Sequence, residues 1–284
     1  MHNEIVVSAE QLHELIQAGD CTVVDCRFDL SRPGKGRMDW LAGHIPGAFY
    51  AHLDDDLAAP IEAHTGRHPL PRTNDFAQYL ASIAWTDGKL LVAYDDGSNA
   101  ISSRLWWLMR YFGQPAALLD GGLVAWKKAG LPLEEGENGV ESAPLEHLVA
   151  DERMIVSADE ILDGLDSPEM LVLDARAPER FSGEIENLDS EAGHIPAALN
   201  RPFGDNLDKE GQFRDSEILK AQFEAALSGF AAADVVHSCG SGVTACHNLF
   251  AMELAGLGLT RLYPGSWSEW IRDPERPLET GKTP

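Results

Sequence analysis

The chain has 284 residues, enough for two domains of ordinary size, and its 44% of hydrophobic residues is typical of a globular protein. Its formal net charge of −24 opposes binding to nucleic acid or to an anionic membrane. Residues 1–8 do not combine a basic start with an apolar run, and no stretch approaches the roughly 18 apolar residues of a membrane span, so we expect a cytoplasmic protein.

Short apolar runs alternate with helical patterns along the first half. Ser8, followed three residues later by Gln11, predicts a helix start in which each side chain accepts a hydrogen bond from the other residue's backbone. The expected helices lie near 9–18, 75–83, 100–112 and 123–129, and the expected strands at 22–25, 90–94 and 117–119. Apolar strands separated by helices predict a mostly parallel sheet with helices on both faces.

The segment 133–151 is acidic, lacks periodicity and is typical of an interdomain linker. We therefore expect an α/β protein with two tandem domains. The expected boundaries are an N-terminal domain at residues 1–135, a linker at 136–152 and a C-terminal domain at 153–284.

Four blocks of the first half return in the same order in the second half. They are residues 8–12 and 157–161, 23–27 and 172–176, 42–46 and 192–196, and 91–98 and 234–241. Four matches in one order indicate a duplicated domain. In this alignment Asp96 stands opposite Cys239, so we expect the loop of the N-terminal copy to be catalytically silent.

Side chains that occur in both copies, including the silent one, are expected to serve the fold. His44 and His194 each precede Ile-Pro and are expected to satisfy backbone groups at a turn. Two further pairs are expected to be structural ion pairs: Asp25 with Arg27, and Asp174 with Arg176.

Cys239 lies on a glycine-rich turn between an expected strand at 233–237 and an expected helix at 243–254. The N–H groups of such a turn and the positive end of a helix dipole lower a thiol pKa and hold an anion, so Cys239 is the candidate nucleophile. The alternative is a small buried cysteine in a phosphate-binding type of turn. A cysteine phosphatase would need an arginine six residues after the nucleophile, where this chain has Ala245.

The other cysteines are Cys21, Cys26 and Cys246. They are too few and too scattered for a disulfide framework, and no Cys-x-x-Cys indicates a zinc site. Cys246 follows Cys239 by seven residues and is either part of the core or a resolving thiol.

Residues 239–246, Cys-Gly-Ser-Gly-Val-Thr-Ala-Cys, resemble the active-site loop of the rhodanese-type sulfurtransferases, in the form found in 3-mercaptopyruvate sulfurtransferases. Thiosulfate sulfurtransferases of that fold usually carry a basic pair where this chain has Gly240 and Ser241. The resemblance covers nearly the whole chain and implies two tandem rhodanese-like domains.

The resemblance also implies a relay in which Ser241 acts with a histidine and an aspartate from the first domain. His68, in the run His-Pro-Leu-Pro, and Asp54, which follows the block 44–48, match these two positions. His64, Asp55 and Asp56 are near alternatives, and Ser241 itself could be an ordinary turn serine.

Arg180 matches the family arginine that holds the carboxylate or sulfonate of the substrate, a task that suits a guanidinium fork. The alternative is a solvated surface arginine. Mercaptopyruvate enzymes often have a second arginine within the next ten residues, whereas the run 184–189 has none, which leaves the substrate open. The expected substrate-binding residues are Arg180 and four residues of the loop: Gly240, Gly242, Val243 and Thr244.

The implied reaction moves a sulfane sulfur from a small anionic donor, with 3-mercaptopyruvate favoured, through a persulfide on Cys239. The acceptor would be a thiol, a thioredoxin-like protein or cyanide, and no metal or organic cofactor is needed. Two alternatives remain: a thiosulfate:cyanide sulfurtransferase, and a non-enzymatic module that binds or carries sulfur.

Overall fold

The computed structural model describes residues 5–144, 147–165 and 167–281, and the chain divides into two compact units. Unit 1 comprises Met1–Ala59, Leu70–Asp151 and Lys209–Gln212. Unit 2 comprises Pro60–Pro69, Glu152–Asp208 and Phe213–Pro284. The short segment Pro60–Pro69 therefore belongs to the unit of the second half, although unit 1 precedes and follows it in sequence.

Unit 1 is built on a five-stranded sheet in the order β1-β5-β4-β2-β3, and all of its strand pairs are parallel. Its strands are β1 Val6–Val7, β2 Cys21–Asp25, β3 Phe49–Tyr50, β4 Leu90–Tyr94 and β5 Ala116–Leu119. Its helices are α1 Ala9–Ala18, α2 Lys35–Ala42, α3 Thr73–Ser82, α4 Ser102–Tyr111 and α5 Gly122–Lys128. The expected strands and helices of the first half are confirmed to within two residues at each end.

Unit 2 holds a four-stranded parallel sheet in the order β7-β6-β8-β9. Its strands are β6 Leu171–Asp174, β7 Leu199–Asn200, β8 Val235–Ser238 and β9 Arg261–Leu262. Its α-helices are α6 Ala158–Gly164, α7 Pro178–Phe181, α8 Ser216–Ala226, α9 Ala245–Leu254 and α10 Ser266–Trp270. Three short 3-10 helices complete it: η1 Glu152–Met154, η2 Phe203–Asn206 and η3 Ala232–Asp234.

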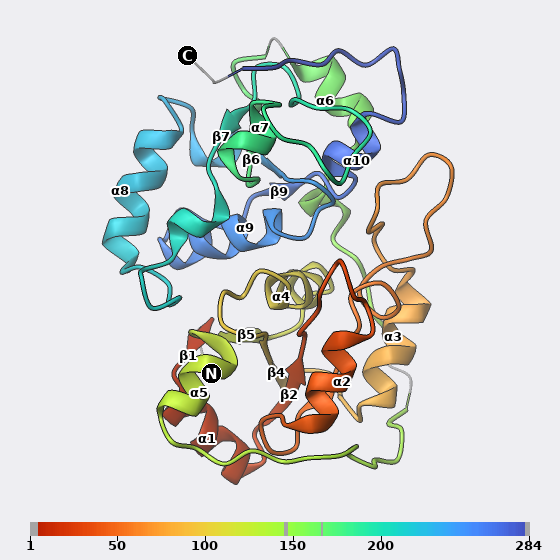
Figure 1. The fold of residues 1–284 in the computed structure, drawn as a ribbon, viewed down its shortest axis with the longest axis vertical. Coiled ribbons are helices and arrows are strands. Elements are labelled where there is room, and N and C mark those ends of the chain that lie inside the picture. Colours follow the sequence, from red (N-terminus) through yellow and green to blue (C-terminus); the bar gives the residue numbers. More distant parts are fainter. Residues whose placement is uncertain (1–4, 145–146, 166, 282–284) are drawn as a thin grey trace. The chain divides into compact units, whose positions relative to one another are not determined.

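Helices cover both faces of each sheet, as expected from the buried strands (Figure 1). In unit 2, Val172 and Val236 pack with residues of α6, α7 and α10 in one apolar cluster. On the opposite face, His237 contacts Met252 of α9. Alternate residues of each strand therefore enter two different layers of core.

Both halves open with the same helix cap. Ser8 Oγ accepts a hydrogen bond from Gln11 N at 3.2 Å, and the Gln11 side chain accepts one from Ser8 N at 2.7 Å. Ser157 and Glu160 repeat this reciprocal pair at 3.2 and 2.8 Å. The capping boxes predicted at both helix starts are confirmed.

The residues shared by both copies do serve the fold. The ring nitrogen Nδ1 lies 2.7 Å from Trp40 O in His44 and 2.8 Å from Phe181 O in His194. Arg27 binds Asp25 at 2.6 Å, and Arg176 binds Asp174 at 2.8 Å, with all four side chains buried. Both predictions are confirmed.

The strand registers correct the alignment of the two loops. Asp25 pairs with Tyr94 and Asp174 pairs with Ser238, so Asp95 follows its strand as Cys239 follows its own. The carbonyl of Asp95 accepts from Leu123 N, as that of Cys239 accepts from Trp267 N. The expectation that Asp96 stands opposite Cys239 was therefore wrong by one residue.

The acidic segment that follows α5 hydrogen-bonds to unit 1 along its length. His44 N donates to Glu134 O, Gly136 N donates to Leu41 O, and Ala143 N donates to Ala81 O. These contacts account for its place in unit 1 despite its lack of helical or strand periodicity. The division at residues 136–152 stays a prediction.

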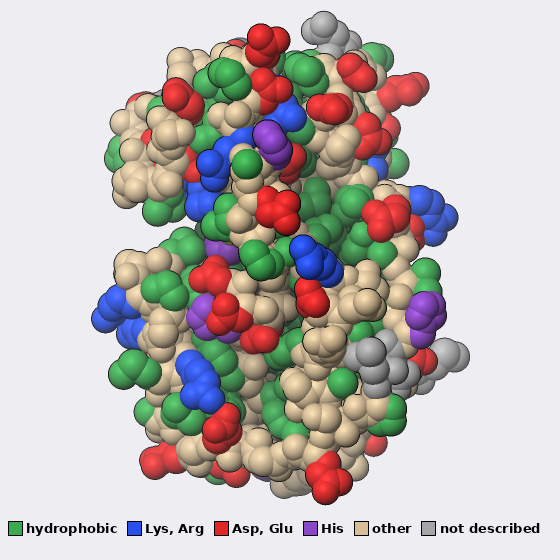
Figure 2. Space-filling view, turned by 90° about the vertical axis from the view of Figure 1, so that its right-hand side faces the viewer, with side chains coloured by type: hydrophobic (Ala, Val, Ile, Leu, Met, Phe, Trp, Pro, Cys, Tyr) green, Lys and Arg blue, Asp and Glu red, His purple; other side chains and the backbone are tan. Residues whose placement is uncertain are grey.

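Acidic side chains are spread over the face drawn in Figure 2, in keeping with the net charge of −24. Across the described residues, the structure has no helix that is both long enough and apolar enough to cross a membrane. An anion that approaches this protein therefore depends on a local positive site.

Candidate active site

Cys239 directly follows β8, at the carboxyl end of a central strand, where parallel sheets bind their ligands. Its N–H donates to Ser266 Oγ at 3.1 Å, and its carbonyl accepts from Trp267 N at 3.0 Å. The side chain is buried. The turn is thus fixed against the first residues of α10.

Gly242 shapes the turn after the cysteine. Its φ of +73° is left-handed, and a β-carbon there would lie 2.3 Å from Pro264 O, so only glycine fits. This conformation directs Gly242 N–H to Cys239 Sγ at 3.1 Å. Helix α9 begins at Ala245, two residues after the start at residue 243 that the sequence pattern predicted.

Three further N–H groups of the loop remain available for a ligand. Those of Ser241, Val243 and Thr244 donate to no acceptor among the residues that the structure describes. They lie just before the N-terminus of α9, a helix of 10 residues. A ring of unused donors at a helix start can hold an anion or the charge of a sulfur leaving group.

His68 is buried beside this loop. Its Nδ1 lies 2.7 Å from Ser241 Oγ, and which atom donates depends on the histidine tautomer. Its neighbour Arg67 donates through the backbone N–H to Ser268 Oγ at 3.0 Å, which ties Pro60–Pro69 to α10. The structure thus brings together His68 and Ser241, while His64 of the same segment is exposed.

Asp54, the third member of the expected relay, lies near the surface in the segment that follows β3 in unit 1. Partial burial raises the pKa of its carboxyl, an effect opposed by nearby His52. Its place in the relay stays a prediction.

Arg180, in α7, is held by two buried carboxylates. Glu186 accepts from its Nε and Nη2 at 3.2 and 2.9 Å, and Asp189 accepts from Nη2 at 3.0 Å. Glu186 also accepts the backbone N–H groups of residues 187–189, which fixes the curve of that segment. Arg180 is therefore an oriented side chain and not a solvated surface arginine.

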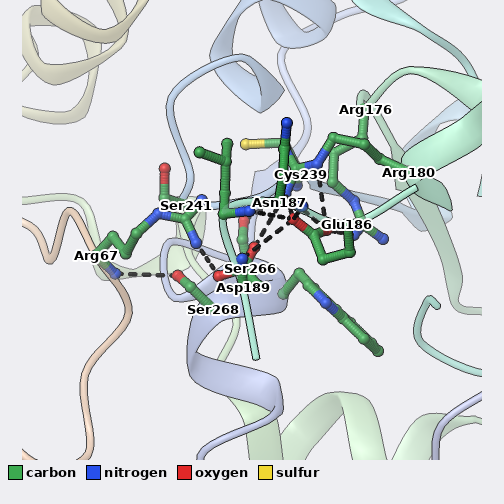
Figure 3. A network of polar contacts seen from close by, with 12 residues as sticks. Arg67, Arg176, Arg180, Glu186, Asn187, Asp189, Cys239, Ser241, Ser266 and Ser268 are labelled. Atoms are coloured by element: carbon green, nitrogen blue, oxygen red, sulfur yellow. Dashed lines mark hydrogen bonds and ion pairs between the residues drawn. The ribbon is translucent and has the colours of Figure 1, made fainter. Parts of the chain in front are cut away.

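A second arginine, Arg67, lies beside Gly240 as Arg180 does, and the sequence alone did not identify it as a site residue (Figure 3). It forms an ion pair with Asp189, and a β-carbon on Gly240 would lie 2.9 Å from its Nη2. Burial and the nearby Arg180 lower the pKa of Arg67, while Cys239 and Glu186 act in the opposite direction. Its position directly before His68 was the only sequence signal for it.

Cys21, Cys26 and Cys246 are free thiols and are buried. Cys246 is buried in α9, and its Sγ donates to Gly242 O at 3.3 Å. A redox role for it stays a prediction. Within the described ranges, no group of three or more His, Cys, Asp and Glu side chains is arranged to hold a metal ion.

The family of the rhodanese-like domain matches residues 8–129 and 157–273 of the chain. A probable 3-mercaptopyruvate sulfurtransferase of Pseudomonas aeruginosa is 44% identical, over 99% of this chain and 100% of that protein. A putative thiosulfate sulfurtransferase, SseB, of Mycobacterium tuberculosis is 36% identical, over 98% of both chains.

Two solved structures share the architecture over most of their length. The 3-mercaptopyruvate sulfurtransferase of Leishmania major superposes with a TM-score of 0.84 at 29% identity, over 96% of this chain and 76% of that one. SseA of Escherichia coli superposes with a TM-score of 0.80 at 30% identity, over 94% of this chain and 100% of that one. The chain belongs to the rhodanese-like family, with two such domains in tandem, and it is a sulfurtransferase.

Proposed function

We propose that this protein takes sulfur from 3-mercaptopyruvate, carries it as a persulfide on Cys239 and delivers it to a thiol. The observation that carries the proposal is the 2.7 Å contact between His68 Nδ1 and Ser241 Oγ, two residues beyond the nucleophile. A positioned proton donor is needed for a carbon leaving group, and it is superfluous for sulfite.

In the first step the Cys239 thiolate attacks the sulfur of the donor. The new S–S bond forms as the C–S bond breaks, and the electron pair leaves on carbon as pyruvate enolate. The N–H of Gly242, 3.1 Å from Cys239 Sγ, supports the thiolate before attack. The loop donors of Ser241, Val243 and Thr244 then bind the charge that develops on the departing group.

In the second part of that step the enolate takes up a proton and becomes pyruvate. Ser241 Oγ supplies it, His68 replaces it, and Asp54 orients and tunes the histidine. Arg180 binds the donor's carboxylate. Gly240 completes this binding surface because it places no side chain between the loop and the arginine.

The persulfide then passes its outer sulfur to the acceptor, which is a small thiol, a reduced thioredoxin-like protein or cyanide. Attack by a thiolate on the outer sulfur releases Cys239 as thiolate and leaves the sulfur on the acceptor. A reducing compartment keeps Cys239 free for the next cycle, so we place the protein in the cytoplasm.

Thiosulfate is the second candidate donor, favoured by the pair of arginines beside the loop, since guanidinium groups bind a sulfonate as readily as a carboxylate. The relative named a putative thiosulfate sulfurtransferase, at 36% identity, also supports it.

The test combines mass spectrometry with steady-state kinetics. After treatment with 3-mercaptopyruvate, wild-type protein should carry one added sulfur on Cys239, and Cys239→Ser should carry none and be inactive, because a hydroxyl forms no persulfide. Cys21→Ser, in unit 1, is the control and should be labelled like wild type. Label on another cysteine would contradict the mechanism, and a higher kcat/KM for thiosulfate would transfer the proposal to that donor.

A further inference from the structure

Two guanidinium groups approach the residue that follows the nucleophile, although they come from distant segments of the chain. A β-carbon on Gly240 would lie 2.9 Å from Arg67 Nη2 and 3.4 Å from Arg180 Nη1. Figure 3 shows Arg67 and Arg180 with Cys239. The absence of a side chain at Gly240 leaves room for both.

Asp189 forms ion pairs with both Arg67 and Arg180. One of its carboxylate oxygens pairs with Arg67 Nη1 and the other accepts from Arg180 Nη2 at 3.0 Å, and its side chain is only 4% exposed. Glu186 holds the outer edge of Arg180. Two carboxylates thus offset the repulsion between like charges and fix the orientation of both guanidinium planes.

Donors remain on the side that faces the loop. Arg67 Nη2 and Arg180 Nη1 donate to no acceptor within the described part of the chain. The two side chains are 23% and 19% exposed, so a small anion can reach them from solvent. Burial and Arg180 both lower the pKa of Arg67, and an anion bound between the two groups would relieve this.

We propose that Arg67 is a donor-binding residue, which with Arg180 clamps the anionic head group of the sulfur donor beside Cys239. This inference rests on the proposed function, because it concerns the donor that loads the cysteine. The run 184–189 contains no arginine, and Arg67 of Pro60–Pro69 supplies the second positive charge in its place. Asp189, from the run 184–189, forms the ion pair that holds Arg67.

The experiment compares two donors that differ only in the head group. With 3-mercaptopyruvate, Arg67→Ala should raise KM by about tenfold to a hundredfold with a much smaller change in kcat, and lysine should restore only part of the loss. With mercaptoacetone, which has the same C–S bond beside a carbonyl but no carboxylate, KM should match wild type. Arg32→Ala, an exposed arginine paired with Asp29, is the control and should behave as wild type with both donors.

A second variant leaves both arginines in place. Gly240→Ala puts a methyl group against Arg67 Nη2 and should raise the KM for 3-mercaptopyruvate by a larger factor than the KM for mercaptoacetone. Thermal melting of each variant should stay near that of wild type, which separates loss of binding from loss of fold.

Anion binding can also be measured without catalytic turnover, as protection of Cys239 from alkylation. Pyruvate should slow the alkylation of Cys239 by iodoacetamide in wild type, and clearly less in Arg67→Ala. An unchanged KM and equal protection in Arg67→Ala would overturn the clamp even where wild type forms the persulfide. Equal losses with the neutral donor would also overturn it, since Arg67 would then only shape the loop. A wild type protected by pyruvate that forms no persulfide would contradict the proposed function and leave the clamp supported.

Discussion

The roles that we propose around Cys239 fall on different residues: two arginines bind the charge of the donor, and His68 with Ser241 transfers a proton. Arg67 and Arg180 place guanidinium groups beside Gly240, whereas His68 contacts the hydroxyl of Ser241. An anionic head group is common to both candidate donors. Only mercaptopyruvate has a leaving group that must be protonated, so the two pairs of residues should respond differently to a change of donor.

His68→Ala tests this division. It should lower mercaptopyruvate turnover by about 10²–10⁴, the usual contribution of general acid–base catalysis, and thiosulfate turnover by much less. The physical reason is that sulfite leaves as a stable anion. If Asp54 belongs to the proposed relay, where it would only orient and tune the histidine, Asp54→Asn should give a weaker version of the same pattern. Steady-state rates with both donors are the measurement.

His64→Ala is the matched control, since that histidine is exposed in the same segment and should leave both rates unchanged. Equal losses with the two donors in His68→Ala would mean that His68 shapes the site. Its assignment as a proton carrier would then be wrong.

The two loops that end the central strands, residues 95–99 and 239–244, differ in how their backbone N–H groups are used, and this difference supports the prediction that the N-terminal copy is catalytically silent. Asp95 turns its buried carboxylate into its own loop and accepts four backbone N–H groups, from Gly97, Asn99, Ile101 and Ser102, at 2.8–3.4 Å. In the other copy the equivalent place holds the sulfur of Cys239, and the N–H groups of Ser241, Val243 and Thr244 donate to no acceptor among the described residues. The first loop is thus filled by its own side chain, in addition to lacking a nucleophile.

Strand β8 contains a buried histidine that links stability to pH. His237 Nε2 lies 3.2 Å from Met252 Sδ, and burial lowers the pKa of His237 to about 3. An unfolded histidine has a pKa of about 6.5, so between these values the unfolded chain binds a proton that the folded chain refuses. The neutral, buried ring of His237 therefore contributes to the free energy of unfolding in full above about pH 6.5, and this contribution is lost as the pH falls toward 3.

His237→Leu should remove this part of the pH dependence. Between pH 7.5 and 5, the free energy of unfolding of wild type should fall by about 2 kcal/mol more than that of the variant. Denaturant unfolding at the two pH values measures it, with His147→Leu, an exposed histidine, as the control substitution. Parallel losses in wild type and His237→Leu would show that the ring is not buried neutral.

At the scale of the whole molecule, the two compact units do not correspond to the first and second halves of the sequence. Pro60–Pro69 belongs to unit 2 and carries both Arg67 and His68, whereas Lys209–Gln212 belongs to unit 1. Gly66 allows Pro60–Pro69 to pack closely against residues 265–268 of unit 2. A β-carbon there would lie 2.5 Å from Gly265 O and 2.8 Å from Ser268 Oγ.

Gly66→Ala should therefore displace the segment and both of its functional side chains. We expect kcat/KM for 3-mercaptopyruvate to fall by about a hundredfold, since misplacement by about 1 Å has this effect in other enzymes. Gly204→Ala, where a β-carbon meets open space, should have no effect. Full activity in Gly66→Ala would contradict the attachment of Pro60–Pro69 to α10.

Local sequence determined much of this protein. The paired capping boxes and the repeated ion pairs depend on contacts over two or three residues, and the alternation of strands and helices follows from local apolar patterns. Such patterns depend on backbone geometry and on short-range hydrogen bonds, which a sequence displays directly. The duplication made each of them visible twice.

Contacts between distant segments decided the rest. His68 meets Ser241 across 173 positions of sequence, and Arg67 meets Asp189 across 122. The equivalence of Asp95 with Cys239 required the strand registers, because the Gly-Ser pairs at 97–98 and 240–241 favour Asp96 in the sequence alignment. Side chains far apart in sequence come together only when the sheet and its connections are fixed, so the second cation of the site could be found only in the tertiary structure.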